Sequence, residues 1–304
     1  MKHTASITFF LLAIFLITQI TGLTLLRFYG IGDISMKDGV VTIDHSQTVE
    51  DFSPQTSGVG SFIYLVSAIL IGTVLVLAII RFNKPMVWKW WFFLAVAISI
   101  GVVFSAVLGV YWLAFIIGGV LAFLKLRWPN VLIHNFTEIL MYSGIMLLLA
   151  PRLDLFWAIM LLLVVSAYDM FAVWKSKHMV KMAVFQTKSK MFAGLMIPYG
   201  GAAGPARESK DVPASQMLSK KGHKNAILGG GDVAFPLIFS GVLMEHLILT
   251  GVEPNLALAK SLIVSVMVTV SLLALFLFAK KDRFYPAMPI VTAGCLVGAV
   301  IALL

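Results

Sequence analysis

Charged residues and cysteine are scarce in this chain of 304 residues. Only 12% of the residues are charged and 60% are apolar, whereas a soluble domain carries about 25% charged and about 45–50% apolar residues. The composition excludes a water-soluble globule, and the high hydrophobicity excludes a disordered chain. The single cysteine, Cys295, excludes an intrachain disulfide, a thiolate metal cage and a Cys-pair redox site. A polytopic membrane protein remains.

Motifs of metal-dependent and serine-dependent hydrolases are missing as well. No His-Glu-x-x-His occurs, so we do not expect a zinc hydrolase. No serine in a Gly-x-Ser-x setting has a suitable histidine partner at membrane depth, which argues against a serine site. His134 and Glu138 are spaced i, i+4, which amounts to only half of a metal site. We therefore predict no metal and no cofactor.

Long apolar runs are the main feature that is present. A bilayer core of roughly 30 Å needs about 20 apolar residues per helix. Nine stretches approach or meet this length: residues 4–26, 58–80, 88–107, 108–124, 130–149, 155–174, 225–249, 256–279 and 285–304. Gly109 alone separates the third stretch from the fourth. We predict an all-α polytopic membrane protein with about nine transmembrane helices.

The predicted helices divide the chain into three parts. Residues 1–174 hold helices one to six, with an outer loop at 27–57 that contains a strand-like run over residues 40–43. Residues 175–224 form a mobile cytoplasmic loop, and residues 225–304 hold helices seven to nine. With the N-terminus in the cytoplasm, 19 of the 23 basic residues lie in inside segments. The positive-inside rule therefore predicts a cytoplasmic N-terminus and an outside C-terminus, and the net charge of +9 reports topology rather than nucleic-acid binding.

Ionisable residues inside the spans are costly and usually functional. Asp169 and Asp232 lie on consecutive antiparallel spans, at depths of roughly 8 and 10 Å below the cytoplasmic boundary if each residue rises 1.5 Å. Glu138 is expected at a similar depth, where it either lines the same cavity or pairs with a lysine. We expect Glu245 and His246 to pair or to snorkel at the outer surface.

Two carboxyls at matched depth indicate coupled acid–base chemistry. In a low-dielectric setting they cannot both ionise easily, so they share a proton. One carboxylate can then activate a water, while its protonated partner polarises a carbonyl and later protonates the leaving nitrogen. A proton relay in a transporter would use the same pair. The three glycines directly before Asp232 permit close approach of another backbone.

Two prolines stand at the start of the last span, in Phe284-Tyr-Pro-Ala-Met-Pro-Ile290. Pro286 and Pro289 fit two interpretations. One is an unwound segment that leaves carbonyl groups free beside protein or water. The other is a simple helix start with proline in its first turn.

Three motifs together resemble those of one known family. Tyr168-Asp169, Gly229-x-Gly231-Asp232 and Pro286-Ala-Met288 are similar, in order, to the Tyr-Asp, Gly-x-Gly-Asp and Pro-Ala-Leu motifs of presenilins and signal peptide peptidases. The nine-span plan is similar too. The resemblance implies an intramembrane aspartyl protease with Asp169 and Asp232 as its catalytic pair. It also implies a set of residues that shape the site and receive unwound substrate: Tyr168, Gly229, Gly231, Pro286, Ala287 and Met288.

The resemblance also implies the setting in which the protein works. We expect an archaeal presenilin homologue in the cell membrane of a prokaryote, acting on transmembrane peptide or protein substrates without accessory subunits or nucleic acid. Homo-oligomerisation and autocleavage of the 175–224 loop stay open. Two alternatives use the same carboxyls. A prepilin-type aspartyl peptidase has fewer spans and commonly a lysine soon after the second aspartate, where this chain has Val233 and Ala234. The other alternative is a proton-coupled transporter or ion leak channel.

Overall fold

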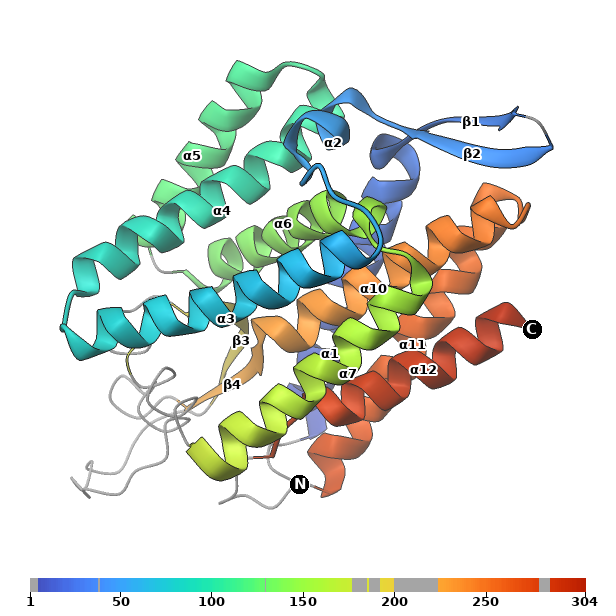
Figure 1. Cartoon of the computed structure of the whole chain (residues 1–304). Helices are drawn as coiled ribbons and strands as arrows, with labels where there is room; N and C mark the ends of the chain where they lie inside the picture. Colours follow the sequence, from blue (N-terminus) through green and yellow to red (C-terminus); the bar gives the residue numbers. More distant parts are fainter. Residues whose placement is uncertain are drawn as a thin grey trace.

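The computed structural model describes residues 5–37, 39–128, 130–176, 185, 192–199, 224–278 and 285–304. These residues contain nine long helices, one in each predicted span (Figure 1). Their bounds are α1 (Ala5–Leu25), α3 (Val59–Arg81), α4 (Pro85–Leu108), α5 (Tyr111–Arg127), α6 (Val131–Leu149), α7 (Leu155–Phe171), α10 (Gly230–Leu249), α11 (Pro254–Phe278) and α12 (Met288–Leu303).

The described part of the chain is an all-α membrane protein with two small hairpins. Seven of its helices are long and apolar enough to cross a membrane. Of the other two, α12 is a shorter apolar helix of 16 residues and α5 has 17 residues. The expected break between the third and fourth spans is present, because Gly109 follows α4 in the left-handed conformation with a φ of 67°. Glycine is the residue that most readily ends a helix in this way.

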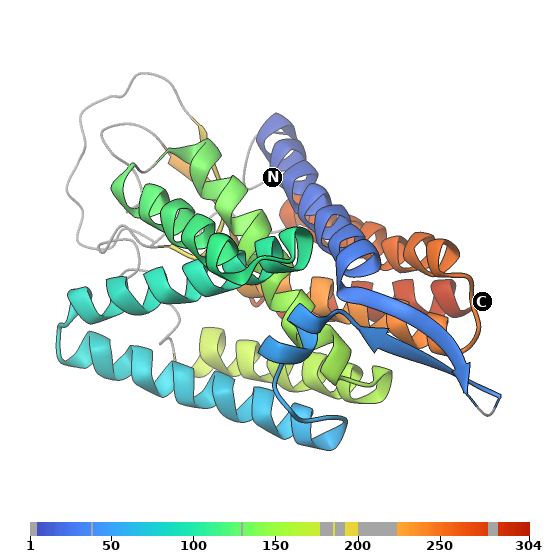
Figure 2. The ribbon, with the colours of Figure 1, turned by 90° about the horizontal axis from the view of Figure 1, so that it is seen from above.

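Close helix contacts in the core depend on small residues, as is usual where lipid surrounds the helices. A Cβ added at Gly144 of α6 would collide with the carbonyl of Ser99 in α4, and one at Gly118 of α5 would collide with the carbonyl of Ala97. Helices α6 and α10 lie between α3, α4 and α5 on one side and α1, α11 and α12 on the other (Figure 2). This arrangement places α10, which carries Asp232, in the interior of the bundle.

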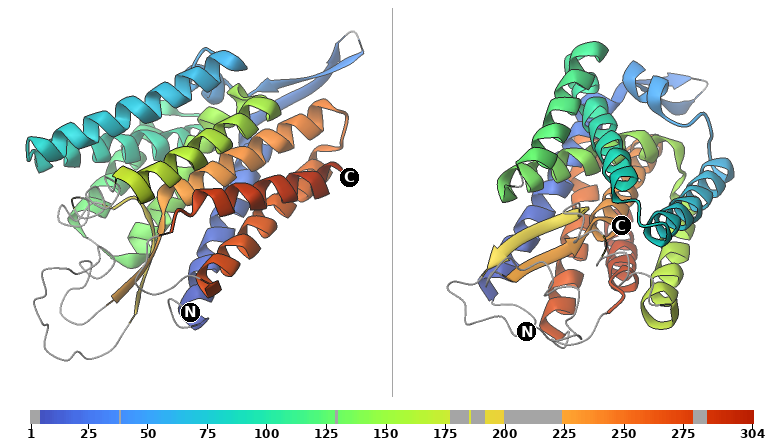
Figure 3. Two further views of the ribbon diagram at one scale, coloured as in Figure 1. Left: turned by 60° about the horizontal axis from the view of Figure 1, so that its bottom comes forward. Right: turned by 90° about the vertical axis from the view of Figure 1, so that its left-hand side faces the viewer.

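Two antiparallel hairpins lie at opposite ends of the bundle (Figure 3). Strands β1 (Ile31–Lys37) and β2 (Val40–His45) form the first, which is followed by the short helix α2 (Gln47–Phe52). The strand-like run predicted at 40–43 is therefore part of β2. His45 Nε2 lies 3.2 Å from Glu245 Oε1 of α10. Glu245 therefore pairs with a histidine, and pairing is one of the two predictions for this residue.

Strands β3 (Gly194–Tyr199) and β4 (Lys224–Gly229) form the second hairpin, in which Gly194 is opposite Gly229. The prediction that the seventh helix begins at residue 225 is therefore wrong, because α10 begins at Gly230. Each glycine in a helix interior costs about 1 kcal/mol relative to alanine, so the three glycines favour a junction between strand and helix. Residues 177–184, 186–191 and 200–223, which together make up most of the predicted cytoplasmic loop, lie outside the described residues.

Candidate active site

Asp169 lies in the last turn of α7, with only 6% of the residue exposed. Its carboxylate Oδ2 accepts the backbone N–H of Met288 at 3.1 Å, and the carboxylate also accepts the N–H of Ala287. Both N–H groups belong to the start of α12, where a helix leaves donors without partners inside the helix. Asp169 therefore caps α12 and binds the backbone of the predicted Pro-Ala-Met motif.

Asp232 lies in the first turn of α10 and is half-buried. Its carboxylate accepts the backbone N–H of Gly229, the residue that caps α10. This is the bond that the third helical residue makes in a capping box. The correction to the helix start thus moves Asp232 from the interior of a helix to its N-terminus.

The structure brings the two predicted aspartates together. Helices α7, α10 and α12 pack against one another, and the carboxyls of Asp169 and Asp232 are close enough for the charge of one to act on the other. Each carboxylate also faces the positive end of a helix dipole, Asp169 at α12 and Asp232 at α10. The site is therefore an acid pair held between two helix N-termini.

The Pro-Ala-Met segment combines both interpretations of its prolines. Pro289 lies in the first turn of α12, as a simple helix start predicts, while residues 285–287 are not helical. Pro286 and Met288 are buried, and the backbone N–H of Met288 contacts Asp169 of α7. Tyr168, another of the residues predicted to shape the site, makes a hydrogen bond to a different helix. Its hydroxyl donates to Thr73 Oγ1 of α3 at 3.2 Å. It links α7 to a neighbouring helix.

The three glycines before Asp232 have different surroundings. A Cβ on Gly229 would lie 3.1 Å from Asp232 Oδ2, and one on Gly230 would lie only 2.6 Å from Tyr142 Oη. Gly231 is exposed, and a Cβ there would find nothing closer than 3.6 Å, on Phe235. Sequence reasoning selected Gly229 and Gly231, but the tightest position is Gly230, which the Gly-x-Gly pattern leaves variable.

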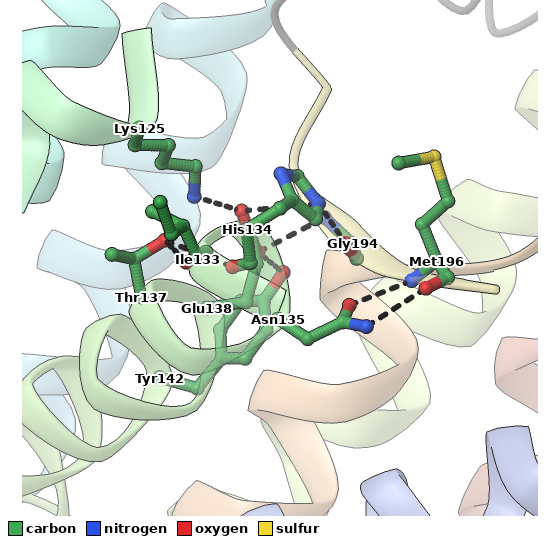
Figure 4. Close-up of polar contacts among 9 residues, drawn as sticks. All are labelled: Lys125, Ile133, His134, Asn135, Thr137, Glu138, Tyr142, Gly194 and Met196. Carbon is green, nitrogen blue, oxygen red and sulfur yellow. Dashed lines mark hydrogen bonds and ion pairs between the residues drawn. The ribbon is translucent and has the colours of Figure 1, made fainter. Parts of the chain in front are cut away.

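Glu138 is fully buried and hydrogen-bonded beside this junction (Figure 4). Lys125 Nζ donates to its Oε1 and Tyr142 Oη donates to its Oε2. The backbone N–H of Gly194 donates to the same Oε2 at 3.0 Å. Pairing with a lysine, one of the two predictions for Glu138, is confirmed. Sequence reasoning missed Tyr142, although a buried carboxylate requires partners.

His134 does not complete a metal site with Glu138. Its Nε2 lies 2.8 Å from the carbonyl oxygen of Gly194 and 4.0 Å from Glu138 Oε1. Among the residues that the structure describes, no group of three or more His, Cys, Asp or Glu side chains could hold a metal ion. The absence of a cofactor stays a prediction.

An acid pair held at the ends of packed, membrane-spanning helices is the arrangement expected of an intramembrane protease of the aspartic type. The model of the family described as signal-peptide peptidase, presenilin aspartyl protease matches residues 12–304. The chain belongs to this family, and it is a multi-pass intramembrane aspartyl protease. The match spans nearly the whole chain, and it supports neither the prepilin-type peptidase nor the transporter alternative.

Two solved structures share this fold. Both are of a presenilin family intramembrane aspartate protease, in the space groups C222 and P2, and each is 15% identical to this chain. The match to the first has a TM-score of 0.56 and covers 96% of this chain and 94% of the chain in that structure. The match to the second has a TM-score of 0.58 and covers 99% of this chain and 97% of the chain in that structure. None of the curated proteins matches the chain.

Proposed function

We propose that Asp169 and Asp232 are the catalytic pair and that they hydrolyse peptide bonds within transmembrane helices of the substrate. The packing of α7, α10 and α12, which brings the carboxyls of Asp169 and Asp232 close enough for one charge to act on the other, is the observation that carries this assignment. A pair that shares one proton supplies a general base for water and an acid for the scissile carbonyl and the leaving nitrogen. Backbone N–H bonds at Asp169 and Asp232 hold each carboxylate in a fixed direction.

The edge of β4 that pairs with no described strand is the proposed place where the substrate binds. The N–H and C=O groups of Gly194 and Met196 bond to α6, so these two residues face away from β4. Backbone groups alternate in direction along antiparallel strands. The groups of Ile227, the partner of Met196, therefore face away from β3. In the described part of the chain, β4 pairs with no strand other than β3.

This edge leads directly to the acid pair. Strand β4 ends at Gly229, and Asp232 follows within one turn of α10. A helical substrate hides its amides in its own hydrogen bonds, so cleavage requires local unwinding. We propose that the unwound segment adds to β4 as a further strand, while exposed Gly231 and the segment 286–288 leave room for its backbone beside Asp232.

The proposed orientation places this end of the bundle in the cytoplasm. The basic residues support it, because most of them lie in segments assigned to that side. Helix α1 begins toward the β3–β4 end and α12 ends toward the β1–β2 end (Figure 3), which fits a cytoplasmic N-terminus and an outside C-terminus. Water would then reach the acid pair from the cytoplasm. A prokaryotic cell membrane and action without accessory subunits remain part of this proposal.

A transition-state mimic tests the assignment of the pair. The probe is a photoreactive peptide with a hydroxyl group in place of the scissile carbonyl, added to the protein in liposomes. We expect labelling of the wild-type protein that is competed by unlabelled mimic, and loss of labelling in Asp169→Asn and Asp232→Asn. Ser261→Ala is the control, because among the described residues that hydroxyl bonds only the carbonyl of Ala257 within α11. Equal labelling of the wild type and both Asp variants would overturn the assignment.

A further inference from the structure

Helix α6 takes the place of a third strand along the outer edge of β3 (Figure 4). Asn135 Nδ2 donates to the carbonyl oxygen of Met196 at 2.8 Å, and the N–H of Met196 donates to Asn135 Oδ1 at 3.0 Å. Two opposed N–H···O bonds to one residue are what a neighbouring antiparallel strand provides. A side-chain amide on a helix thus reproduces the contact of a strand.

The same face of α6 binds the first residue of β3. His134 Nε2 contacts the carbonyl oxygen of Gly194 at 2.8 Å, and the N–H of Gly194 donates to Glu138. Further along, Pro198 has no N–H to offer at this edge. The edge of β3 is therefore occupied by side chains at Gly194 and Met196, whereas the outward-facing backbone groups of Ile227 on β4 offer a pairing edge to another strand in the described hairpin.

The cluster around Glu138 also reaches the start of α10. Tyr142 donates to Glu138, and its Oη lies against Gly230, two residues before Asp232. The N–H of Gly230 in turn donates to the carbonyl oxygen of Ala193, directly before β3, at 3.3 Å. One buried cluster therefore contacts both the beginning of β3 and the turn that positions Asp232.

We propose that His134, Asn135 and Glu138 are positioning residues that fix the hairpin against α6 and thereby set the register of the substrate strand relative to Asp232. This inference rests on the proposed binding of substrate at β4. A slip of one residue in strand pairing turns every side chain to the other face. A fixed hairpin therefore presents one peptide bond to the acid pair, whereas a loosened hairpin presents several.

The test uses Asn135→Leu, which keeps a similar shape but removes both bonds to Met196. The control is Ser143→Ala, because within the part of the chain that the structure describes the Ser143 hydroxyl bonds only the carbonyl of Ile139 in α6. A single-span peptide of defined sequence in proteoliposomes is the probe. Mass spectrometry of the products, kcat, KM and amide exchange over Gly194–Tyr199 are the measurements.

We expect Asn135→Leu to raise KM several-fold with a smaller change in kcat, to spread cleavage to neighbouring bonds and to speed exchange at Met196. Ser143→Ala should match the wild type. If Asn135→Leu does not fold, His134→Phe should give smaller changes in the same direction. Unchanged cleavage position and KM, or unchanged exchange at Met196, would overturn the positioning role. A wild-type protein that cuts nothing would instead overturn the proposed function, and the positioning role with it.

Discussion

The backbone N–H of Met288 donates to the carboxylate of Asp169, with 3.1 Å between nitrogen and Oδ2. This bond joins the end of α7 to the start of α12, so an acid of the candidate site is also the cap of a neighbouring helix. The Pro-Ala-Met segment and the acid pair are therefore one structural unit. Substitutions at Asp169 should affect both the chemistry and the packing of α12.

Asp169→Ala and Asp169→Asn should differ in stability. Alanine removes the acceptor of the Met288 N–H, which we expect to cost about 1 kcal/mol, as loss of a helix cap does. Asparagine keeps a side-chain oxygen that can accept the same bond. Unfolding of the detergent-solubilised protein by a denaturing detergent measures the difference. Equal stability of the two variants would contradict a capping role for Asp169.

Gly230→Ala and Gly231→Ala should separate folding from substrate contact. A Cβ at Gly230 would press on Tyr142 Oη at 2.6 Å, whereas one at Gly231 has nothing within 3.5 Å. We expect Gly230→Ala to lower both thermal stability and cleavage, and Gly231→Ala to keep wild-type stability. Any loss of cleavage in Gly231→Ala then reports contact with the substrate. Thermal unfolding and cleavage assays of both variants test this prediction. It would be contradicted if the Gly231→Ala protein were less stable than the Gly230→Ala protein.

The buried pair of Lys125 and Glu138 should be strongly coupled. Glu138→Gln leaves the Lys125 ammonium buried without a counter-charge, and breaking such a pair typically costs about 3–5 kcal/mol. Adding Lys125→Met removes that unpaired charge, so the double variant should be more stable than Glu138→Gln alone. A double-mutant cycle of unfolding free energies measures the coupling. Additive effects of the two substitutions would contradict it.

Met288→Leu should leave cleavage within a few-fold of the wild type. The side chain is 4% exposed and packs against apolar neighbours, and volume-conserving swaps of this kind usually cost less than about 1.5 kcal/mol. The contact with Asp169 uses the backbone N–H, which leucine retains. Kinetics on a single-span peptide check this, and loss of cleavage would show that the Met288 side chain itself contributes to the site.

The helices, and the acidic residues within them, could be predicted from the sequence because continuous apolar runs of about 20 residues encode them. The apolar runs placed all nine helices, and the rarity of acids inside them selected Asp169 and Asp232. Strand β4 was missed because the apolar residues 226–228 precede a helix, and so short a run has no period that separates strand from helix. The contacts of Asn135 with Met196 and of Tyr142 with Gly230 could not be predicted, since each joins residues some sixty or more positions apart in the sequence.

Cleavage of a single-span reporter by purified protein in liposomes tests the central claim most directly. The wild type is compared with Asp169→Asn and Asp232→Asn, with Ser261→Ala as the matched control. Both asparagine variants keep the side-chain shape but cannot act as acid or base. We predict that the wild type and Ser261→Ala release the same product, while each asparagine variant falls to background although it folds. Wild-type cleavage by either asparagine variant would contradict the account.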